Sequence, residues 1–234
     1  MTDAEKRIAQ RIALLVLVYT VAMLVAHRGL GMDNPVSHLF FTKPCLAENA
    51  RQCWLINKSD YWSTFFWHSL PSGIFKLCGV AAAGVAVAGS FIPRIRKYRY
   101  TAMVLLVAIA VPAGIVSLLK SYTGHYCPAQ LALYGGPVGA TETTLTPRCF
   151  PAGFPAPGFG LLVVYFSALP YFWRKTGLYA GLGLGAVMGI IQLARGEHFL
   201  SHIIATCLTA LFVGCLLYLF NEYQTVRHRA DLDR

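Results

Sequence analysis

The feature that most constrains this chain is a series of apolar runs, each close to the length that crosses a lipid bilayer. A helix that crosses a hydrocarbon core of about 30 Å needs about 20 mostly apolar residues. Such runs, bounded by charge or by Pro and Gly, lie at residues 11–26, 73–92, 101–119, 157–173, 177–193 and 202–220. We therefore predict an all-α polytopic membrane protein with six transmembrane helices, forming a single membrane-embedded domain over residues 1–234.

Composition supports this class and excludes two others. The chain is 56% hydrophobic and 13% charged, a balance that a soluble globular domain does not have. Its formal charge of +10 falls in short clusters between the apolar runs, where Lys and Arg face anionic headgroups, so we predict no nucleic-acid partner. The first run lacks a small-residue cleavage site, which predicts a retained span and not a cleaved signal peptide.

The basic clusters predict the orientation, because short cytoplasmic loops carry the excess of Lys and Arg. The clusters fall on one side of the six-span topology, at residues 6–11, 94–99, 174–175 and 227–234. We predict that both termini are cytoplasmic and that two long loops, residues 28–72 and 120–156, are extracytoplasmic. The predicted location is a bacterial inner membrane, with the active site facing the periplasm.

Cysteine placement gives an independent indication of the same topology. Cys45, Cys53, Cys127 and Cys149 all fall in the two long outside loops, and disulfides persist in oxidising compartments. Four cysteines allow three pairings, of which Cys45 with Cys53 and Cys127 with Cys149 are the simplest. A zinc site is the competing interpretation, but no Cys-x-x-Cys pair accompanies these residues.

The strongest polar signal lies between the last two runs. His198 and His202 are four residues apart, so on a helix they share one face, and imidazoles beside a membrane are functional candidates. An unremarkable interfacial pair is the alternative. A metal pair lacks the Glu of a His-Glu-x-x-His pattern, and we predict no metal and no cofactor.

Two weaker signals accompany it. Lys120 ends the third run, and the segment from Cys149 to Phe154 opens the fourth, where Gly153 exposes backbone N–H groups suited to an anion. Each has a structural alternative, because Lys120 can snorkel to the interface and Pro-Ala-Gly can be a plain helix entry.

Taken in this order, the three segments resemble the motifs of the type 2 phosphatidic acid phosphatase superfamily. The family patterns are Lys-x6-Arg-Pro, then Pro-Ser-Gly-His, then Ser-Arg-x5-His-x3-Asp. The resemblance covers roughly residues 120–206 and includes the six-helix topology of the integral-membrane branch. It implies hydrolysis or transfer of phosphate on lipid phosphates and pyrophosphates without a metal, with the third-motif His as nucleophile and with Lys and Arg clamping the phosphate.

In the first two motifs the match is partial. The matching residues are Lys120, Pro128, Pro151 and Gly153. Cys127 stands in place of Arg, Ala152 in place of Ser, and Phe154 in place of the His that the resemblance assigns as general acid. A disulfide from Cys127 to Cys149 would tie the first motif to the second. Phe154 has no proton to donate, and general acid catalysis is typically worth about 10²–10⁴ in rate, so His125 or Glu197 would have to supply it.

In the third motif, His198 takes the nucleophile position and His202 stands in place of the Asp. Ile191 and Gln192 occupy the Ser-Arg pair, and Arg195, one turn later, lies on the same helix face. A neutral His202 can accept a proton from His198 and so fix its tautomer. The resemblance thus implies His198 and His202 as catalytic residues, with Lys120, Arg195 and Gly153 binding phosphate.

The predicted function is a membrane lipid phosphate or pyrophosphate phosphatase or phosphotransferase that acts on the extracytoplasmic face through a His nucleophile. The alternative is a catalytically impaired pseudophosphatase that binds anionic lipid headgroups or serves as an assembly partner. Transporters and structural membrane proteins unrelated to the family form a third class. The sequence yields no prediction of the lipid or of the oligomeric state.

Overall fold

The computed structural model describes residues 3–28, 31–42, 53–139 and 145–232. Across these ranges the regular elements are helices, and β pairing is limited to isolated bridges, Phe41 with Trp54 and Leu131 with Val138. The predicted all-α class is confirmed.

Five helical stretches within the described ranges are long and apolar enough to cross a membrane. They contain α1 Asp3–His27, α4 Leu70–Phe91, α5 Arg99–Lys120, α8 Tyr171–Ala194 and α9 Leu200–Leu232. The shorter elements are α2 Asp33–Phe40, α3 Tyr61–Thr64, the π-helix η2 Phe65–Ser69, the 3-10 helices η3 Pro93–Tyr98, η4 Pro128–Gln130 and η5 Ala132–Tyr134, and α6 Ala156–Gly160 with α7 Leu162–Tyr165.

The predicted fourth span differs from the other five. In place of one long helix over residues 157–173, α6 and α7 together form a short apolar helix over Ala156–Tyr165. At 1.5 Å per residue, its ten or so residues reach about 15 Å, half of a hydrocarbon core. It packs against α5, α8 and α9, and most of its residues are buried. A Cβ at Gly160 would overlap the backbone of Ala108, so this close approach to α5 requires glycine.

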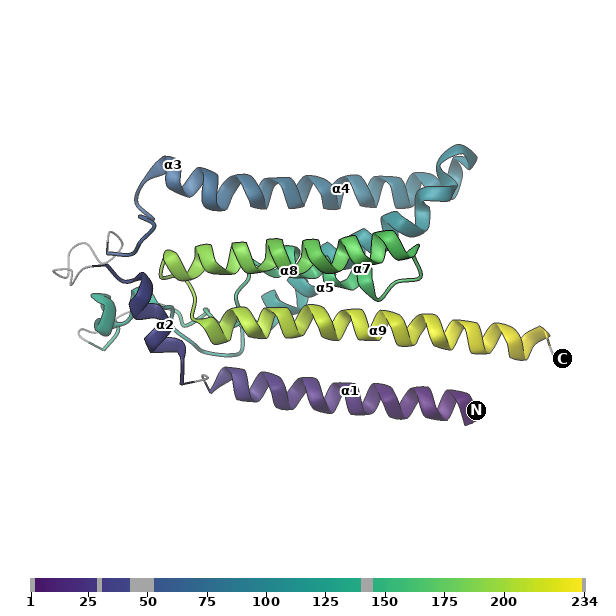
Figure 1. The fold of residues 1–234 in the computed structure, drawn as a ribbon, viewed down its shortest axis with the longest axis horizontal. Coiled ribbons are helices and arrows are strands. Elements are labelled where there is room, and N and C mark those ends of the chain that lie inside the picture. Colours follow the sequence, from purple (N-terminus) through teal and green to yellow (C-terminus); the bar gives the residue numbers. More distant parts are fainter. Residues whose placement is uncertain (1–2, 29–30, 43–52, 140–144, 233–234) are drawn as a thin grey trace.

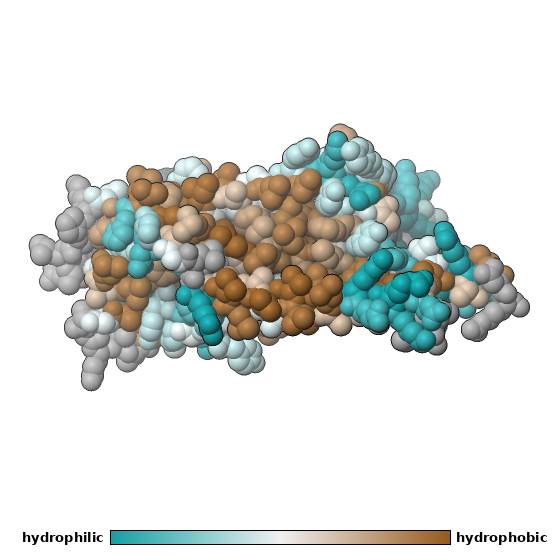
Figure 2. Space-filling model, turned by 60° about the horizontal axis from the view of Figure 1, so that its bottom comes forward, coloured by the Kyte–Doolittle hydropathy of each residue, from teal (hydrophilic) through white to brown (hydrophobic). Residues whose placement is uncertain are grey.

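The two chain ends lie together at one end of the helix bundle (Figure 1). The turn between α8 and α9 lies at the opposite end, beside α2 (Figure 1). On the face shown in Figure 2, apolar side chains form a band across the middle, and hydrophilic side chains gather most densely to its right. This distribution is that of a protein embedded in a bilayer.

Packing around α9 positions the end that is far from the termini. Helix α1 packs along α9, and α5 and α7 contact it from other sides. Ala26 of α1, Phe150 of the loop before α6 and Ala205 of α9 are buried in one cluster. The loop that opens the predicted fourth span is therefore packed directly onto the first turns of α9.

Candidate functional site

The turn between α8 and α9 carries the predicted third motif. Helix α8 ends with hydrogen bonds from the backbone N–H of Arg195 to Ile191 O (3.1 Å) and of Gly196 to Leu193 O (3.0 Å). Gly196 has φ +66°, and a Cβ there would overlap the indole of Trp54. Only glycine fits this left-handed position, which reverses the chain directly before His198.

Segments from other parts of the chain hold this turn in place. The backbone N–H and the hydroxyl of Ser201 donate to the Asp33 carboxylate over 2.8 and 2.6 Å, so α2 caps the start of α9. Lys58 forms an ion pair with Glu197. The backbone N–H of Ala129 donates to Gly196 O over 2.9 Å. The turn is thus fastened by segments from three parts of the chain.

His198 and His202 lie together inside the protein, as their spacing predicts. Their side chains are 5% and 1% exposed, and their Nδ1 atoms are 3.5 Å apart. Burial, followed by the neighbouring His202 and the charge of Lys120, lowers the pKa of His198 well below its usual range. A neutral imidazole has one donor and one acceptor nitrogen, so a hydrogen bond between these two atoms needs the proton on one Nδ1 and the lone pair on the other.

The predicted disulfide between Cys127 and Cys149 is present and touches the His pair. Its S–S distance is 2.10 Å, and Cys149 Sγ lies 3.3 Å from His198 Nδ1. A disulfide sulfur has no hydrogen, so it can accept from His198 only in the tautomer with a proton on Nδ1, and its 2.9 Å approach to Glu197 O is a contact without a donated proton. Cys53 is also disulfide-bonded. Cys45, its predicted partner, lies outside the described residues.

The side chains of Cys149, His198 and His202 together resemble a metal-ligand set. Ligand atoms of Cys149, His198 and His202 all lie within 4.8 Å of one another. A metal binds cysteine as the thiolate, which the disulfide removes. In the oxidised protein the cluster therefore offers two imidazoles only, and we assign it no metal.

The loop from Cys149 to Phe154 forms the second part of the site, and backbone groups hold it. Ala152 N–H donates to His202 O over 3.1 Å, and the Thr206 hydroxyl donates to Ala152 O over 2.7 Å. Thr123, after α5, donates through its hydroxyl to Phe150 O. These bonds fix the loop against α9 and beside the end of α5.

Lys120 and Gly153 lie side by side where these segments meet. A Cβ at Gly153 would lie 3.6 Å from Lys120 Nζ. The charge of Lys120 also acts on His198, where it is one of the causes of the lowered pKa. The structure therefore places Lys120 beside Gly153 and within electrostatic range of His198.

Arg195 supplies the most informative observation in the site. Its side chain is 3% exposed, and its one hydrogen bond among the described residues runs from Nη2 to Thr64 Oγ1 at 3.5 Å. Its Nε and Nη1, and the neighbouring Gln192 Nε2, are buried without a partner in that part of the chain. Burial lowers the pKa of Arg195 and Glu197 opposes this shift, but a guanidinium stays protonated. Buried cationic donors that lack acceptors are costly, so Arg195 is a candidate for binding an anion.

The two groups proposed from the sequence as alternative proton sources, Glu197 and His125, both contact other side chains. Glu197 is paired with Lys58. The His125 ring packs against His27, with ring centroids 4.2 Å apart, and lies edge-on to His202. Burial, followed by His27, lowers the pKa of His125.

Several residues of the site were missed at the level of the sequence. They are Asp33, which caps α9, Thr64, which contacts Arg195, and His68, whose ring stacks on Phe154 with centroids 4.8 Å apart. All three come from segments remote from the motifs. Gln192 was placed in the Ser-Arg pair, but its unpaired amide was not foreseen. The available signal was a polar residue, Gln192, in an apolar run one helical turn before Arg195, since polar side chains are rarely buried without a reason.

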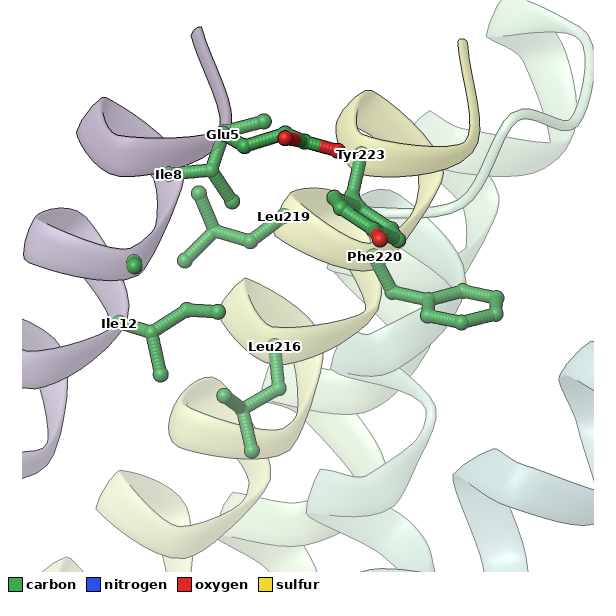
Figure 3. A pocket seen from close by; sticks show the side chains of 8 residues that line it. Glu5, Ile8, Ile12, Leu216, Leu219, Phe220 and Tyr223 are labelled. Carbon is green, nitrogen blue, oxygen red and sulfur yellow. The ribbon is translucent and has the colours of Figure 1, made fainter. Parts of the chain in front are cut away.

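A large hollow lies elsewhere and has a different character. It has a volume of 520 Å³ and lies between α1 and α9, lined by apolar side chains such as Ile12 and Leu216 (Figure 3). Glu5 and Tyr223 are its polar-bearing members (Figure 3). It contains no imidazole and no cation, so it does not offer the chemistry of the site beside His198.

Comparison with known proteins gives one family. The PAP2 superfamily matches residues 101–225, more than half of the chain, from α5 through most of α9. No curated protein and no solved structure matches the chain.

Proposed function

This chain belongs to the PAP2 superfamily, and on that premise we propose that it is an integral-membrane phosphatase or phosphotransferase acting on lipid phosphates or pyrophosphates through His198. The observation that carries the proposal is the buried Arg195 guanidinium with two unpaired nitrogens. Along the chain, Arg195 comes three residues before His198, whose imidazole is buried with His202 and lies within the electrostatic influence of Lys120. An anion site next to a neutral imidazole is what nucleophilic attack on phosphorus requires.

The contacts of His198 support a choice of its attacking atom. Its Nδ1 faces His202 Nδ1 and the Cys149 sulfur, both of which can accept a proton. With the proton held on Nδ1, the lone pair of the neutral ring is on Nε2. We assign Nε2 as the nucleophile and His202 as the residue that fixes this tautomer, in the way that the third member of a triad orients its base.

Positive charge supports the rest of the step. Arg195 and Lys120 would hold the phosphoryl oxygens, and Gly153 beside Lys120 leaves room for the backbone to approach them. Charge that develops on these oxygens in the transition state is stabilised by preformed donors in a site shielded from water. No cofactor enters this assignment.

A second candidate function rests on Phe154. This residue occupies the position of the family's acid, and a phenyl ring donates no proton. A pseudophosphatase that binds anionic headgroups, or that serves as an assembly partner, would use the same Arg195 and Lys120 without turnover.

We also propose that the site faces the periplasm of a bacterial inner membrane and that residues 1–234 act as one membrane-embedded domain. Support comes from the position of the site at the end opposite both termini (Figure 1) and from the disulfide, which belongs in an oxidising compartment. Single cysteines placed at residues 94–100 should be protected from an impermeant thiol reagent added outside intact cells. Labelling there from outside would contradict the orientation.

The experiment for the function is phosphate release by the purified protein in lipid vesicles, from a panel of lipid phosphates and pyrophosphates with a chelator present. We expect release that falls at least about 10³-fold in His198→Ala, since loss of a nucleophile removes the covalent route. His228→Ala, on an exposed residue near the end of α9, is the control and should match the wild type. Release unaffected by His198→Ala would contradict the proposal, and binding without release would favour the pseudophosphatase.

A further inference from the structure

We propose that His68 is the general acid of this site, donating the proton that the leaving oxygen needs. The inference deepens the proposed phosphatase function and rests on it. It adds a catalytic residue from the segment before α4, which the family match at residues 101–225 does not cover.

The geometry of this segment carries the proposal. Thr64 and His68 are one helical turn apart, across the junction of α3 and the π-helix η2. The Thr64 hydroxyl lies 3.5 Å from Arg195 Nη2, and the His68 ring stacks on Phe154, with centroids 4.8 Å apart and planes 15° apart. The segment thus contacts the phosphate-binding Arg195 with one residue and the loop beside Lys120 with the other. His68 lies over the ring that fills the position of the missing acid.

The segment is held in this place by its own contacts. The Asp60 carboxylate accepts from Ser63 N–H over 2.7 Å and caps α3. The Thr64 hydroxyl donates to Lys58 O over 3.0 Å, and Lys58 is paired with Glu197 of the α8–α9 turn. His68 is therefore connected to the site through an ordered chain of contacts. Short π-helical turns such as η2 are frequent at functional sites.

Other proton-bearing groups around the site have different roles. Glu197 is occupied by Lys58, and His125 packs between His27 and His202 on the side of the disulfide loop. His68 is exposed, unlike the buried pair, so its ring is not enclosed by the protein. An imidazole is also the side chain best suited to exchange a proton near neutral pH.

In the proposed reaction, the phosphoryl group passes from the lipid to His198 and then to water. Nε2 of His198 bonds to phosphorus while the bond from phosphorus to the leaving oxygen breaks, and that oxygen takes its proton from the His68 imidazolium. Neutral His68 then accepts a proton from a water whose oxygen attacks phosphorus. The nitrogen–phosphorus bond breaks, its electron pair returns to His198, and inorganic phosphate leaves. One lipid phosphate and one water yield one lipid alcohol and one phosphate.

The test compares two substrates in His68→Gln. A long-chain alkyl monophosphate has a poor leaving group that needs the proton, and p-nitrophenyl phosphate has a good one that does not. We expect turnover of the alkyl ester to fall by about 10²–10⁴ and turnover of the aryl ester by less than about 10-fold. The control His228→Gln should leave both rates unchanged. Adding Phe154→His to His68→Gln should restore part of the alkyl rate, because it returns a donor to the adjacent position.

The outcomes separate this inference from the function beneath it. If the wild type releases phosphate from neither substrate, both proposals fail. If His198→Ala abolishes release but His68→Gln keeps the wild-type ratio between the two substrates, only the role of His68 is overturned. Vanadate binding reports whether the pocket is intact. If His68→Gln lowers vanadate binding, the ratio of alkyl to aryl turnover is measured in His68→Asn. A wild-type ratio in His68→Asn overturns the role of His68 as general acid.

Discussion

The turn between α8 and α9, taken here with the start of α9 as far as His202, and the loop from Cys149 to Phe154 lie side by side at the site, yet they are built from different kinds of group. The turn presents a guanidinium and two imidazoles, and loops from three other parts of the chain fasten it. The loop presents apolar side chains and glycine. It is held by backbone hydrogen bonds and by a disulfide.

The difference shows how the two parts divide the work. In the proposed function the turn acts through individual side chains, so a single substitution there should remove binding or chemistry. The loop is proposed to contribute through the path of its backbone. Changes of its side chains should therefore be tolerated, whereas loss of the Cys127–Cys149 disulfide should not. The following predictions are arranged to test this division.

The largest effect is expected on the turn. In Arg195→Met, two or more charge-assisted hydrogen bonds to phosphate are lost, each worth about 1.5–3 kcal/mol. The ratio kcat/KM should therefore fall by about 10²–10⁴, with a parallel loss of vanadate affinity. The matched change on the loop, Ala152→Gly, should change kcat/KM by less than about 10-fold. Equal losses from both variants would contradict the division.

The next largest effect is expected on stability, from removing the disulfide that holds the loop. The Cys127–Cys149 disulfide has a sequence separation of 22, and closing a loop of this length stabilises the folded state by about 3 kcal/mol. The double variant Cys127→Ser and Cys149→Ser should lower the free energy of unfolding by about that amount, measured by thermal denaturation in detergent. Cys78→Ser is the control, because this thiol is free and exposed. An unchanged midpoint in the double variant would show that backbone bonds alone hold the loop.

A smaller effect is expected at the cap of α9. Asp33→Ala removes both acceptors of Ser201, and loss of a helix cap typically costs about 1 kcal/mol. Because the same helix carries His202, phosphate release should fall together with the thermal midpoint. Asp3→Ala, at an exposed ion pair near the N-terminus, should change neither. Release that stays at the wild-type rate in Asp33→Ala would separate the cap from the site.

The smallest effect is the acid dependence of stability. The pKa of His198 is lowered in the folded protein, whereas in the unfolded chain it is about 6.5. Between these values the unfolded state binds more protons, so the contribution to stability is complete above about pH 6.5 and is lost as the pH falls. From pH 6.5 to 5.5 the loss should be about 1 kcal/mol. His198→Gln should reduce this slope, and an equally steep slope in the variant would exclude His198 as its source.

The lipid-facing part of the fold was predictable because a bilayer imposes length and polarity on every helix that crosses it. The short helix formed by α6 and α7 was not predictable, because a run buried among other helices is as apolar as a run that faces lipid. Within the site, the spacing of His198 and His202 was enough to pair them, and the order of the motifs was enough to expect Lys120 beside Gly153. Contacts such as Thr64 with Arg195 join distant loops and leave no periodic pattern.

The disulfide has one more consequence, for when the protein becomes active. Cys149 Sγ touches His198, so the surroundings of the proposed nucleophile are complete only after oxidation. A reducing cytosol does not support that bond. The chain would therefore mature only once both cysteines have crossed the membrane, and newly made copies would stay inactive toward the phosphate esters of the compartment where they are synthesised.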